Sequence, residues 1–444
     1  MLSALATDLY QVTMMAGYHA SGQDQPRTFE LFVRGLPEHR QYLVVAGLEQ
    51  AIEYLTNLRF TPEEIAWLRT LPALADVPSS FFDSYLPAFG FTGDVWAVEE
   101  GEVVFSHEPM VRVTAPAAEA QLVETALLSL VTFQTSVASK TSRVVTAAGG
   151  RVVIEFGTRR AHGLDAGVHA ARAAYIAGCA STSNLEAGRR FGIPVSGTMA
   201  HSWVMGFPDE IDAFRQYMQI FGPHTTLLID TYDTLVAARR IVATGLRPTA
   251  VRLDSGDLLA LSHHVRKIFD EGGLAATRIL VSGDLDEHRI DRLVRGGAPI
   301  DGFGVGTAIS VVSDAPALGG VYKLVETMES GQARPTVKLS TGKRTFPGRK
   351  QVWRVSQGGI ATHDVIGLED ERQQDGRALL VPVMRRGVPV APATPIDQMR
   401  QRCTQRVAEL PAAVRALDGG AAYAVRVSDA LNHLARSAVV PVNR

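Results

Sequence analysis

Residues 250–257 read AVRLDSGD, a short apolar run that ends in acids and a glycine turn. This plan recurs between residues 152 and 325. The stretches between the runs, such as Leu258–Glu271 and Glu287–Gly296, carry apolar residues at helical spacing. Most intervals have room for a strand, a crossover helix and a loop, which is typical of a parallel α/β fold. The apolar runs begin near Val152, Ile193, Thr225, Ala250, Arg278, Asp301 and Val321.

Two parallel architectures fit this plan. An open doubly wound sheet collects its ligand at one switch point and uses only a few strand ends. A barrel brings the carboxyl ends of all its strands to one face. Here nearly every predicted strand ends in charged, hydroxyl or glycine residues, and about seven strands are visible rather than eight. We therefore expect an irregular, incomplete α/β barrel.

The two flanks of the barrel region have a different pattern. Predicted strands such as Thr28–Val33 and Val95–Val98 lie among helical stretches, and Gln121–Val137 is expected to form a long apolar helix that leads into the barrel. Near the other end, short strand-like runs alternate with Gly and Pro, most clearly at 381–390. We expect the two flanks to fold together as a second, α+β domain. The predicted segments are residues 1–137, 138–330 and 331–444.

Composition bounds the class of protein. The chain has 444 residues, 46% of them apolar, which excludes a disordered protein, and its net charge is only −2, which gives no reason to expect a nucleic-acid or membrane partner. Its two cysteines cannot form a disulfide framework, and no Lys or Arg of a secretory signal occurs in the first 26 residues. No apolar run approaches the roughly 18–20 residues of a membrane span. We expect a soluble cytoplasmic protein.

Cations and glycines gather at the predicted strand ends. Arg159 and Arg160 follow one strand directly, and Arg252 and Lys323 are expected on the same rim. Together they favour an anion site, although an isolated pair of arginines is more often a surface ion-pair cluster. The Gly304–Thr307 turn can offer backbone N–H groups to a phosphate, or it is a turn without a ligand.

A basic stretch lies further along the chain. Residues 334–354 contain seven Lys or Arg and no acid. Such a run is most often a solvated loop. It could instead supply cations to a polyphosphate.

Acids reach the same rim in unusual number. So many carboxylates need compensation by cations, hydroxyl donors or Mg²⁺, and together with arginines and glycine turns they suggest a sugar-phosphate substrate. Charge balancing alone would account for some of them. They are Asp230, Asp233, Asp254, Asp257 and Asp284.

His201 is the histidine most suited to chemistry. It lies in SGTMAHS, just past a predicted strand end and beside hydroxyl residues. A neutral imidazole there can act as base or nucleophile, with Asp230 as the expected orienting partner. The alternative is a structural histidine bonded to backbone. No Walker A, HExxH, CxxC or GxSxG motif occurs, which disfavours zinc hydrolysis and serine-esterase chemistry.

Eight short stretches, in this order, carry a resemblance to a known family. They are Ala6–Gln11, Phe29–Arg34, Glu155–His162, Gly197–Trp203, Asp230–Asp233, Arg252–Asp257, Gly319–Leu324 and Lys343–Arg354. Over nearly its whole length the chain resembles nicotinate phosphoribosyltransferase. The resemblance implies the type II phosphoribosyltransferase fold, an irregular barrel plus an α/β sandwich built from both chain ends. It also implies a homodimer with active sites shared between the subunits.

The resemblance implies a reaction in NAD salvage. Nicotinate and phosphoribosyl pyrophosphate would give nicotinate mononucleotide and pyrophosphate, driven by ATP hydrolysis in a ligase-type enzyme. His201 would be phosphorylated by ATP, and Asp230 would orient its ring. Mg²⁺ would bridge the polyphosphates, with its protein ligands unassigned.

The resemblance also assigns substrate contacts. Phe156 would stack on one face of the pyridine ring and Tyr10 of the other subunit on the opposite face. Arg252 would meet the nicotinate carboxylate, and Asp254 and Asp284 are candidates for the ribose. The groups expected to hold phosphate are Arg159, Gly304, Gly306 and Thr307.

Three alternatives remain open. Relatives that use nicotinamide place an Asp near the amide, whereas residues 180–185 offer hydroxyls and Asn184, which favours the acid; Glu186 is close by. Quinolinate enzymes are shorter and lack the phosphorylated histidine. A catalytically inactive sensor would be expected to lose His201, Arg252 or Asp254, and all three are present. One departure is His162, where many relatives have Gln.

Overall fold

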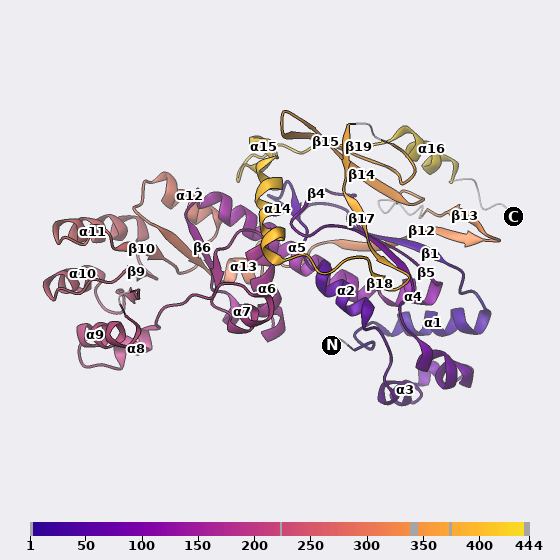
Figure 1. Ribbon diagram of the computed structural model, residues 1–444, viewed down its shortest axis with the longest axis horizontal. Helices are drawn as coiled ribbons and strands as arrows, with labels where there is room; N and C mark the ends of the chain where they lie inside the picture. The colour runs from indigo at the N-terminus through magenta and orange to yellow at the C-terminus, as the bar shows by residue number, and fades with distance from the viewer. Residues whose placement is uncertain (1–2, 223, 338–344, 373–374, 439–444) are drawn as a thin grey trace. The chain divides into compact units, whose positions relative to one another are not determined.

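The computed structural model describes residues 3–222, 224–337, 345–372 and 375–438. The chain forms two units (Figure 1). One, here called the sandwich unit, comprises Met1–Ser136 and Ala317–Arg444; the other, the barrel unit, is Val137–Pro316. Helix α5 (Glu124–Ala147) runs from the first into the second.

A six-stranded parallel sheet forms the centre of the barrel unit. Its order is β7-β6-β11-β10-β9-β8, and the end strands β7 and β8 do not pair with each other, so the described sheet does not close on itself. This confirms the incomplete α/β barrel. The strands are β6 (Val152–Glu155), β7 (Ser181–Thr182), β8 (Thr226–Leu228), β9 (Ala250–Leu253), β10 (Arg278–Val281) and β11 (Gly302–Val305).

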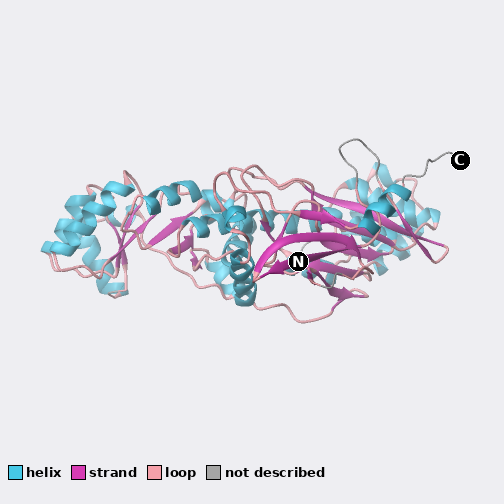
Figure 2. Ribbon diagram, turned by 90° about the horizontal axis from the view of Figure 1, so that it is seen from above, coloured by secondary structure: helices cyan, strands magenta, loops and turns pink. Residues whose placement is uncertain are grey.

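Helices connect these strands and lie beside them (Figure 2). The expected helices at 258–271 and 287–296 are confirmed as α11 and α12, and each begins at an aspartate that caps it. The helices are η4 (Thr158–Arg160), α6 (Leu164–Ile176), α7 (Leu185–Phe191), α8 (His201–Met205), α9 (Glu210–Phe221), α10 (Thr234–Ala243), α11 (Leu258–Glu271), α12 (Glu287–Arg295) and α13 (Thr307–Ser310).

Two of the seven expected barrel strands are wrong. The run near Ile193 makes only an isolated bridge between Thr182 and Val195, and the sixth strand of the sheet is β7 instead. The run near Val321 forms β12, which pairs antiparallel with β1 in the sandwich unit. An apolar run predicts a strand, but its sheet depends on which distant partner satisfies its hydrogen bonds.

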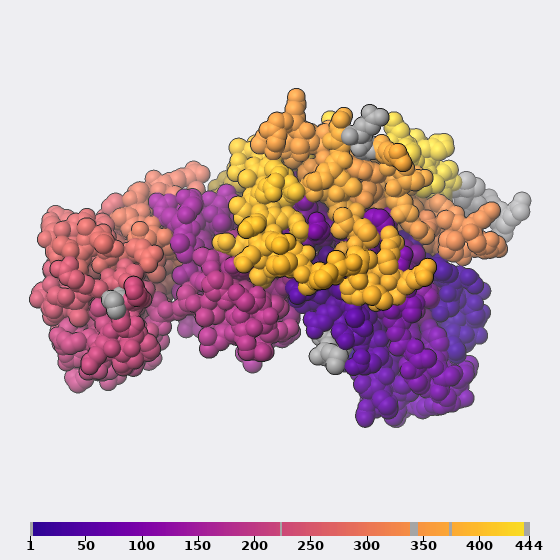
Figure 3. Space-filling model, in the orientation of Figure 1, coloured from indigo at the N-terminus to yellow at the C-terminus, as the bar shows by residue number. Residues whose placement is uncertain are grey.

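The sandwich unit is built from both ends of the chain. Its seven-stranded sheet has the order β13-β12-β1-β5-β3-β17-β18, so N-terminal strands pair with C-terminal ones on both sides. A four-stranded sheet, β16-β14-β15-β19, comes wholly from the C-terminal part. In the space-filling view, orange and yellow residues lie against indigo ones (Figure 3). The expectation that the flanks fold together is confirmed.

The strands expected at 28–33 and 95–98 are β1 and β3. The strands of this unit are β1 (Arg27–Val33), β2 (Leu43–Val44), β3 (Asp94–Val98), β4 (Val103–Val104), β5 (Pro109–Ala115), β12 (Gly320–Glu329), β13 (Gln332–Pro335), β14 (Lys350–Gln357), β15 (Ile360–Leu368), β16 (Gly376–Ala378), β17 (Leu380–Arg385), β18 (Val388–Pro389) and β19 (Val425–Val427). Its helices are α1 (Leu9–Ser21), α2 (Leu48–Thr56), α3 (Pro62–Leu68), η1 (Pro72–Leu74), η2 (Phe81–Tyr85), η3 (Leu86–Ala88), α4 (Ala117–Leu122), α14 (Ile396–Ala408), α15 (Ala412–Arg415) and α16 (Asp429–Ser437).

The helical run Ala117–Ala147 contradicts the expectation that no apolar segment approaches the length of a membrane span. Among the described residues it is long and apolar enough to cross a membrane, with a window of mean hydropathy 1.3. The search of the sequence for a long apolar run missed this segment because Glu119 and Glu124 interrupt its apolar residues. Within that window 61% is buried inside the protein, as in the core helix of a soluble protein.

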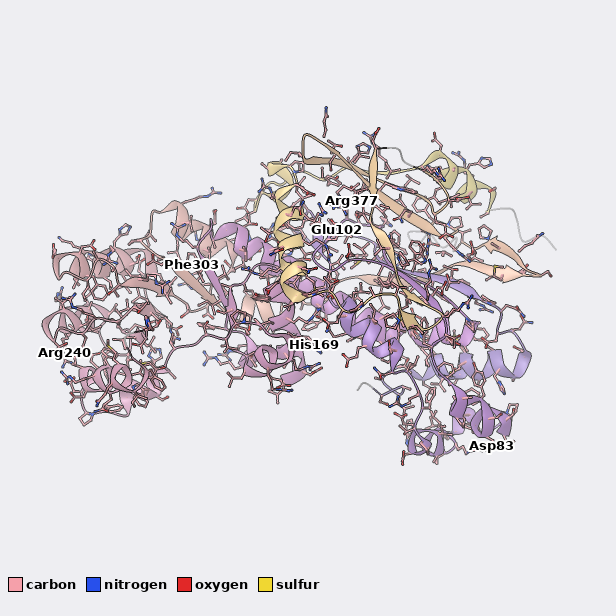
Figure 4. The ribbon with its side chains drawn as sticks, viewed as in Figure 1. Asp83, Glu102, His169, Arg240, Phe303 and Arg377 are labelled. Carbon is pink, nitrogen blue, oxygen red and sulfur yellow. The ribbon has the colours of Figure 1, made fainter. Side chains whose placement is uncertain are left out.

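A buried ion cluster joins the two ends of the chain in the sandwich unit. The guanidinium of Arg354 on β14 contacts Glu102 at 2.8 Å and Asp364 at 2.5 Å, and all three side chains are almost fully buried. Arg377, labelled with Glu102 in Figure 4, contacts the second carboxylate oxygen of Glu102 at 2.8 Å. Both acids are buried and share this central cation, while Arg406 also contacts Glu102 at 3.2 Å.

We expect Arg354→Met to lower the free energy of unfolding by about 3–5 kcal/mol, since it leaves Glu102 and Asp364 buried without their shared cation. Arg377→Met, which removes a 40% exposed partner of the same glutamate, is the matched control and should cost under about 1 kcal/mol. Urea unfolding followed by tryptophan fluorescence measures both. Equal losses in the two variants would contradict the central role of Arg354.

Candidate active site

The carboxyl ends of the parallel strands meet at one edge of the barrel sheet, as parallel strands require. Phe156 follows β6, Gly306 follows β11 and Asp254 follows β9, while Asp284 lies three residues beyond the end of β10. Asp230 lies two residues beyond the end of β8. Five of the predicted site residues therefore come from five different strands.

The ring of Phe156 lies directly on the backbone of β11. A Cβ atom at Gly304 would be 2.5 Å from Phe156 Cδ2, so only glycine leaves room for the ring there. Phe156 N donates to Val305 O at 2.8 Å, which fixes the strand end. A cavity of about 60 Å³ adjoins the ring and is also lined by Thr198 and Arg252. An aromatic face and a cation thus border one small space.

Arg252 is a partly buried cation with spare donor capacity. Its Nη1 donates to Thr198 Oγ1, while its Nε is buried without a hydrogen-bond partner among the described residues. Burial lowers the pKa of Arg252; Asp254 and Asp230 oppose the shift, and Arg159 adds to it. The anion site that the sequence predicts at Arg159 and Arg252 stays a prediction.

His201 begins α8, and its side chain is 40% exposed. Its Nδ1 is hydrogen-bonded to Thr231 Oγ1 at 3.1 Å, and its Nε2 lies 4.0 Å from Asp254 Oδ2. Asp230 instead uses Oδ2 to accept from Asp254 N at 3.1 Å and from the Ser255 hydroxyl at 2.6 Å. The hydroxyl of Thr231 thus stands where Asp230 was expected. Sequence reasoning missed Thr231, although it lies within the quoted DTYD stretch.

The acids of the rim divide into two groups. Asp233 accepts from the first N–H groups of α10 and Asp257 from Ala260 N in α11, so both are helix caps. Asp254 accepts from Ser282, and Asp284 has a left-handed φ of 46°. Glycine is required at position 283, between Ser282 and Asp284, because a Cβ atom there would lie 1.9 Å from the carbonyl oxygen of Asp254. Asp230, Asp254 and Asp284 remain free of capping roles.

A divalent cation fits only a limited part of this edge. Across the described ranges no group of three or more His, Cys, Asp or Glu side chains could hold a metal. Asp230 Oδ1, however, is buried without a hydrogen-bond partner among the described residues, and its other oxygen is joined to Asp254. Mg²⁺ commonly takes one or two carboxylates and completes its shell with substrate phosphates and water. The pair Asp230 and Asp254 is suited to that role.

A buried network supports the turn that carries Phe156 and Arg159. Glu155, 1% exposed, accepts from Thr182 Oγ1 at 2.6 Å and from Gly157 N. Asn184 donates to Thr158 Oγ1 at 2.9 Å and caps α7 by accepting from Ala187 N. Sequence reasoning missed Glu155, since a charged residue at a strand end gave no indication of burial. The side chain of Asn184, expected near the base, is committed to the scaffold.

Two predicted residues belong to the sandwich unit. Tyr10 lies on α1, is 50% exposed, and its hydroxyl is 3.5 Å from Glu124. Lys323, expected on the barrel rim, lies on β12 of the antiparallel sheet, so that placement is wrong.

The basic stretch 334–354 is partly accounted for. Residues 338–344 lie outside the described residues. Of the others, Lys350 pairs with Glu30 at 2.7 Å and Arg349 with Glu326 at 2.7 Å. These cations are structural ion pairs and not a solvated loop.

Burial raises the pKa of Glu155, and hydrogen bonds from Thr182 and Gly157 only partly oppose it. A carboxyl with a raised folded pKa contributes stability fully below its unfolded pKa, and that contribution is lost as pH rises through the folded value. We therefore expect the stability of Glu155→Gln, relative to the unsubstituted protein, to improve as the pH rises above the ordinary pKa of a glutamate and through the raised pKa of Glu155. Urea unfolding followed by circular dichroism measures the difference, with Glu271→Gln, 68% exposed, as control. Parallel pH profiles for Glu155→Gln and the unsubstituted protein would contradict this.

Three family models match the chain. They are the nicotinate phosphoribosyltransferase N-terminal domain over residues 5–132, the nicotinate phosphoribosyltransferase family over 152–323, and its C-terminal domain over 372–435.

The relatives extend over most of the chain. It is 45% identical over 436 residues to nicotinate phosphoribosyltransferase pncB2 of Mycobacterium tuberculosis. The matched region covers 96% of this chain and 92% of that protein. It is 44% identical over 388 residues to the nicotinate phosphoribosyltransferase of Bacillus subtilis, spanning 85% and 78%. The crystal structure of human nicotinic acid phosphoribosyltransferase matches with a TM-score of 0.84 and 28% identity, covering 97% and 99%. With its incomplete barrel and its sandwich of both chain ends, the protein belongs to the nicotinate phosphoribosyltransferase family.

Proposed function

We propose that this protein makes nicotinate mononucleotide and pyrophosphate from nicotinate and phosphoribosyl pyrophosphate, in NAD salvage. The observation that carries the proposal is the small space bordered by the ring of Phe156 and by Arg252, whose buried Nε lacks a partner among the described residues. A flat aromatic acid matches both features, because its ring can stack and its carboxylate can receive the guanidinium donors. The membership of the family supports the same reaction.

The nicotinate acid is preferred to its amide in this proposal. Arg252 supplies donors and a positive charge, which favour a carboxylate over a neutral amide. Asn184 is occupied by Thr158 and by the cap of α7, so it does not serve the base. Tyr10 of a second subunit would cover the other face of the pyridine, which requires a homodimer with shared active sites. We expect the enzyme to work in the cytoplasm.

The phosphoribosyl group is proposed to lie along the strand ends. Asp254 and Asp284 would accept from ribose hydroxyls, and Arg159 with the amides of Gly306 and Thr307 would hold phosphate, with Gly304 keeping the backbone accessible. Bound Mg²⁺, held by Asp230 and Asp254, would neutralise polyphosphate charge. The anomeric carbon passes through an oxocarbenium-like state, so positioning and charge stabilisation are what these side chains contribute.

ATP is proposed to act through His201. The lone pair of one ring nitrogen attacks the γ-phosphorus, the bond to ADP breaks with its electrons going to ADP, and water later hydrolyses the nitrogen–phosphorus bond. The ring is partly exposed and accessible, and it lies beside Asp254 at the same edge. Asp230, expected to orient the ring of His201 directly, would act on it indirectly: it accepts a hydrogen bond from Asp254 N, and Asp254 lies beside the ring.

The test is product formation from nicotinate or nicotinamide, each with phosphoribosyl pyrophosphate and Mg²⁺, with and without ATP. We expect nicotinate mononucleotide, formed faster with ATP, and little product from nicotinamide. Turnover of nicotinamide alone would replace the acid by the amide as substrate. No turnover with either base would overturn the proposed function.

His201→Ala separates the ATP step from the transfer. We expect this variant to lose stimulation by ATP while retaining slow ATP-independent product formation, because the alanine has no nitrogen to phosphorylate. Circular dichroism checks that the fold is unchanged. Stimulation by ATP equal to that of the unsubstituted enzyme would remove His201 from its proposed role.

A further inference from the structure

The two nitrogens of the His201 ring have different surroundings. Nδ1 is engaged at 3.1 Å by the hydroxyl of Thr231, in the turn after β8. Nε2 has a carboxylate oxygen of Asp254 at 4.0 Å, beyond hydrogen-bond distance. One nitrogen is therefore occupied by a neutral group, and the other is left available beside the proposed site of the polyphosphate.

From this geometry we infer that Thr231 is the positioning residue of His201, and that it directs the phosphoryl group to Nε2. The inference rests on the proposed function, in which ATP phosphorylates this ring. When Nδ1–H donates to Thr231 Oγ1, the neutral ring carries its lone pair on Nε2, and only that nitrogen can attack phosphorus.

A hydroxyl suits both states of the ring. Before transfer, the oxygen of Thr231 accepts from Nδ1–H. Attack by Nε2 forms the nitrogen–phosphorus bond and releases ADP, and the Nδ1 proton then leaves to solvent water, so that the phosphorylated ring is neutral. Thr231 can now rotate its O–H and donate to the bare Nδ1. A carboxylate could only accept, and would lose its hydrogen bond at that point.

Asp230 has a separate task in this arrangement. Its Oδ2 holds both the backbone N–H of Asp254 and the hydroxyl of Ser255, so it fixes the turn after β9. Thr231 follows it directly in the chain and fixes the ring. Consecutive residues of one turn thus orient the two groups that face each other, His201 and Asp254.

The experiment compares Thr231→Val, which keeps the shape and loses the hydroxyl, with Thr231→Ser, which restores it. Thr244→Val is the matched control: it removes a hydroxyl that donates to Arg240 O at 2.7 Å near the end of α10, away from the strand ends. Each protein is measured for turnover with and without ATP and for phosphate incorporated from γ-labelled ATP. Nitrogen-15 spectra of labelled histidine identify the tautomer of His201 in the free protein and the phosphorylated nitrogen.

We expect the unsubstituted protein to carry Nδ1–H and to be phosphorylated on Nε2. Thr231→Val should mix the tautomers and reduce both labelling and ATP-stimulated turnover about five- to tenfold, the factor for one neutral hydrogen bond. Its ATP-independent turnover should fall by a smaller factor than its ATP-stimulated turnover, whereas a merely structural defect would lower both alike. Thr231→Ser and Thr244→Val should behave like the unsubstituted protein.

Several results would overturn the inference. They are phosphate on Nδ1, unchanged tautomer and labelling in Thr231→Val, or a serine variant as impaired as the valine one. A protein that takes up no label would overturn it together with the ATP step. Formation of nicotinate mononucleotide without ATP would then still support the transferase function, so the two failures are distinguishable.

Discussion

Close approach between neighbouring turns is the constraint on which the candidate site depends. Parallel strands place their turns side by side at one edge, and a Cβ atom at Gly283 or at Gly304 would collide with the neighbouring segment. Gly304 leaves room for the ring of Phe156, and Gly283 leaves room for the carbonyl oxygen of Asp254. A Cβ atom at Gly304 would displace the ring of Phe156, and one at Gly283 would displace the backbone of Asp254. The chemistry therefore rests on the backbone geometry of the sheet.

Hydrogen bonds to two carboxylates, Glu155 and Asp230, support this edge. Glu155 and Thr182 hold the turn that carries Phe156, and Asp230 holds the turn that carries Asp254. Hydrogen bonds of this kind are short and directional, and in a buried setting they are costly to leave unmade. They keep the side chains that would meet substrate in defined positions. Some of the acidic side chains therefore hold the turns in place, and others are available for the proposed chemistry.

The sequence predicted the barrel well where local pattern was enough. Five of its strands and the helices α11 and α12 followed from apolar runs and helical spacing. Strand β7 was missed because two polar residues carry no apolar run, and β12 was assigned to the wrong sheet because its partner β1 lies almost 300 residues earlier. Pairing over that distance depends on register between whole sheets, which no local window contains.

By itself, the sequence determined which chemistry gathers at the strand ends: Phe156, Arg159, His201, Arg252 and the aspartates were all recognisable there. Only the tertiary structure decided how they divide their tasks. It made Asp233 and Asp257 helix caps, and it gave His201 a hydroxyl partner in place of a carboxylate. Adjacent residues in an extended turn point different ways. Which of two neighbours reaches a distant ring is therefore set by the turn's position in the sheet, and residue type does not specify that.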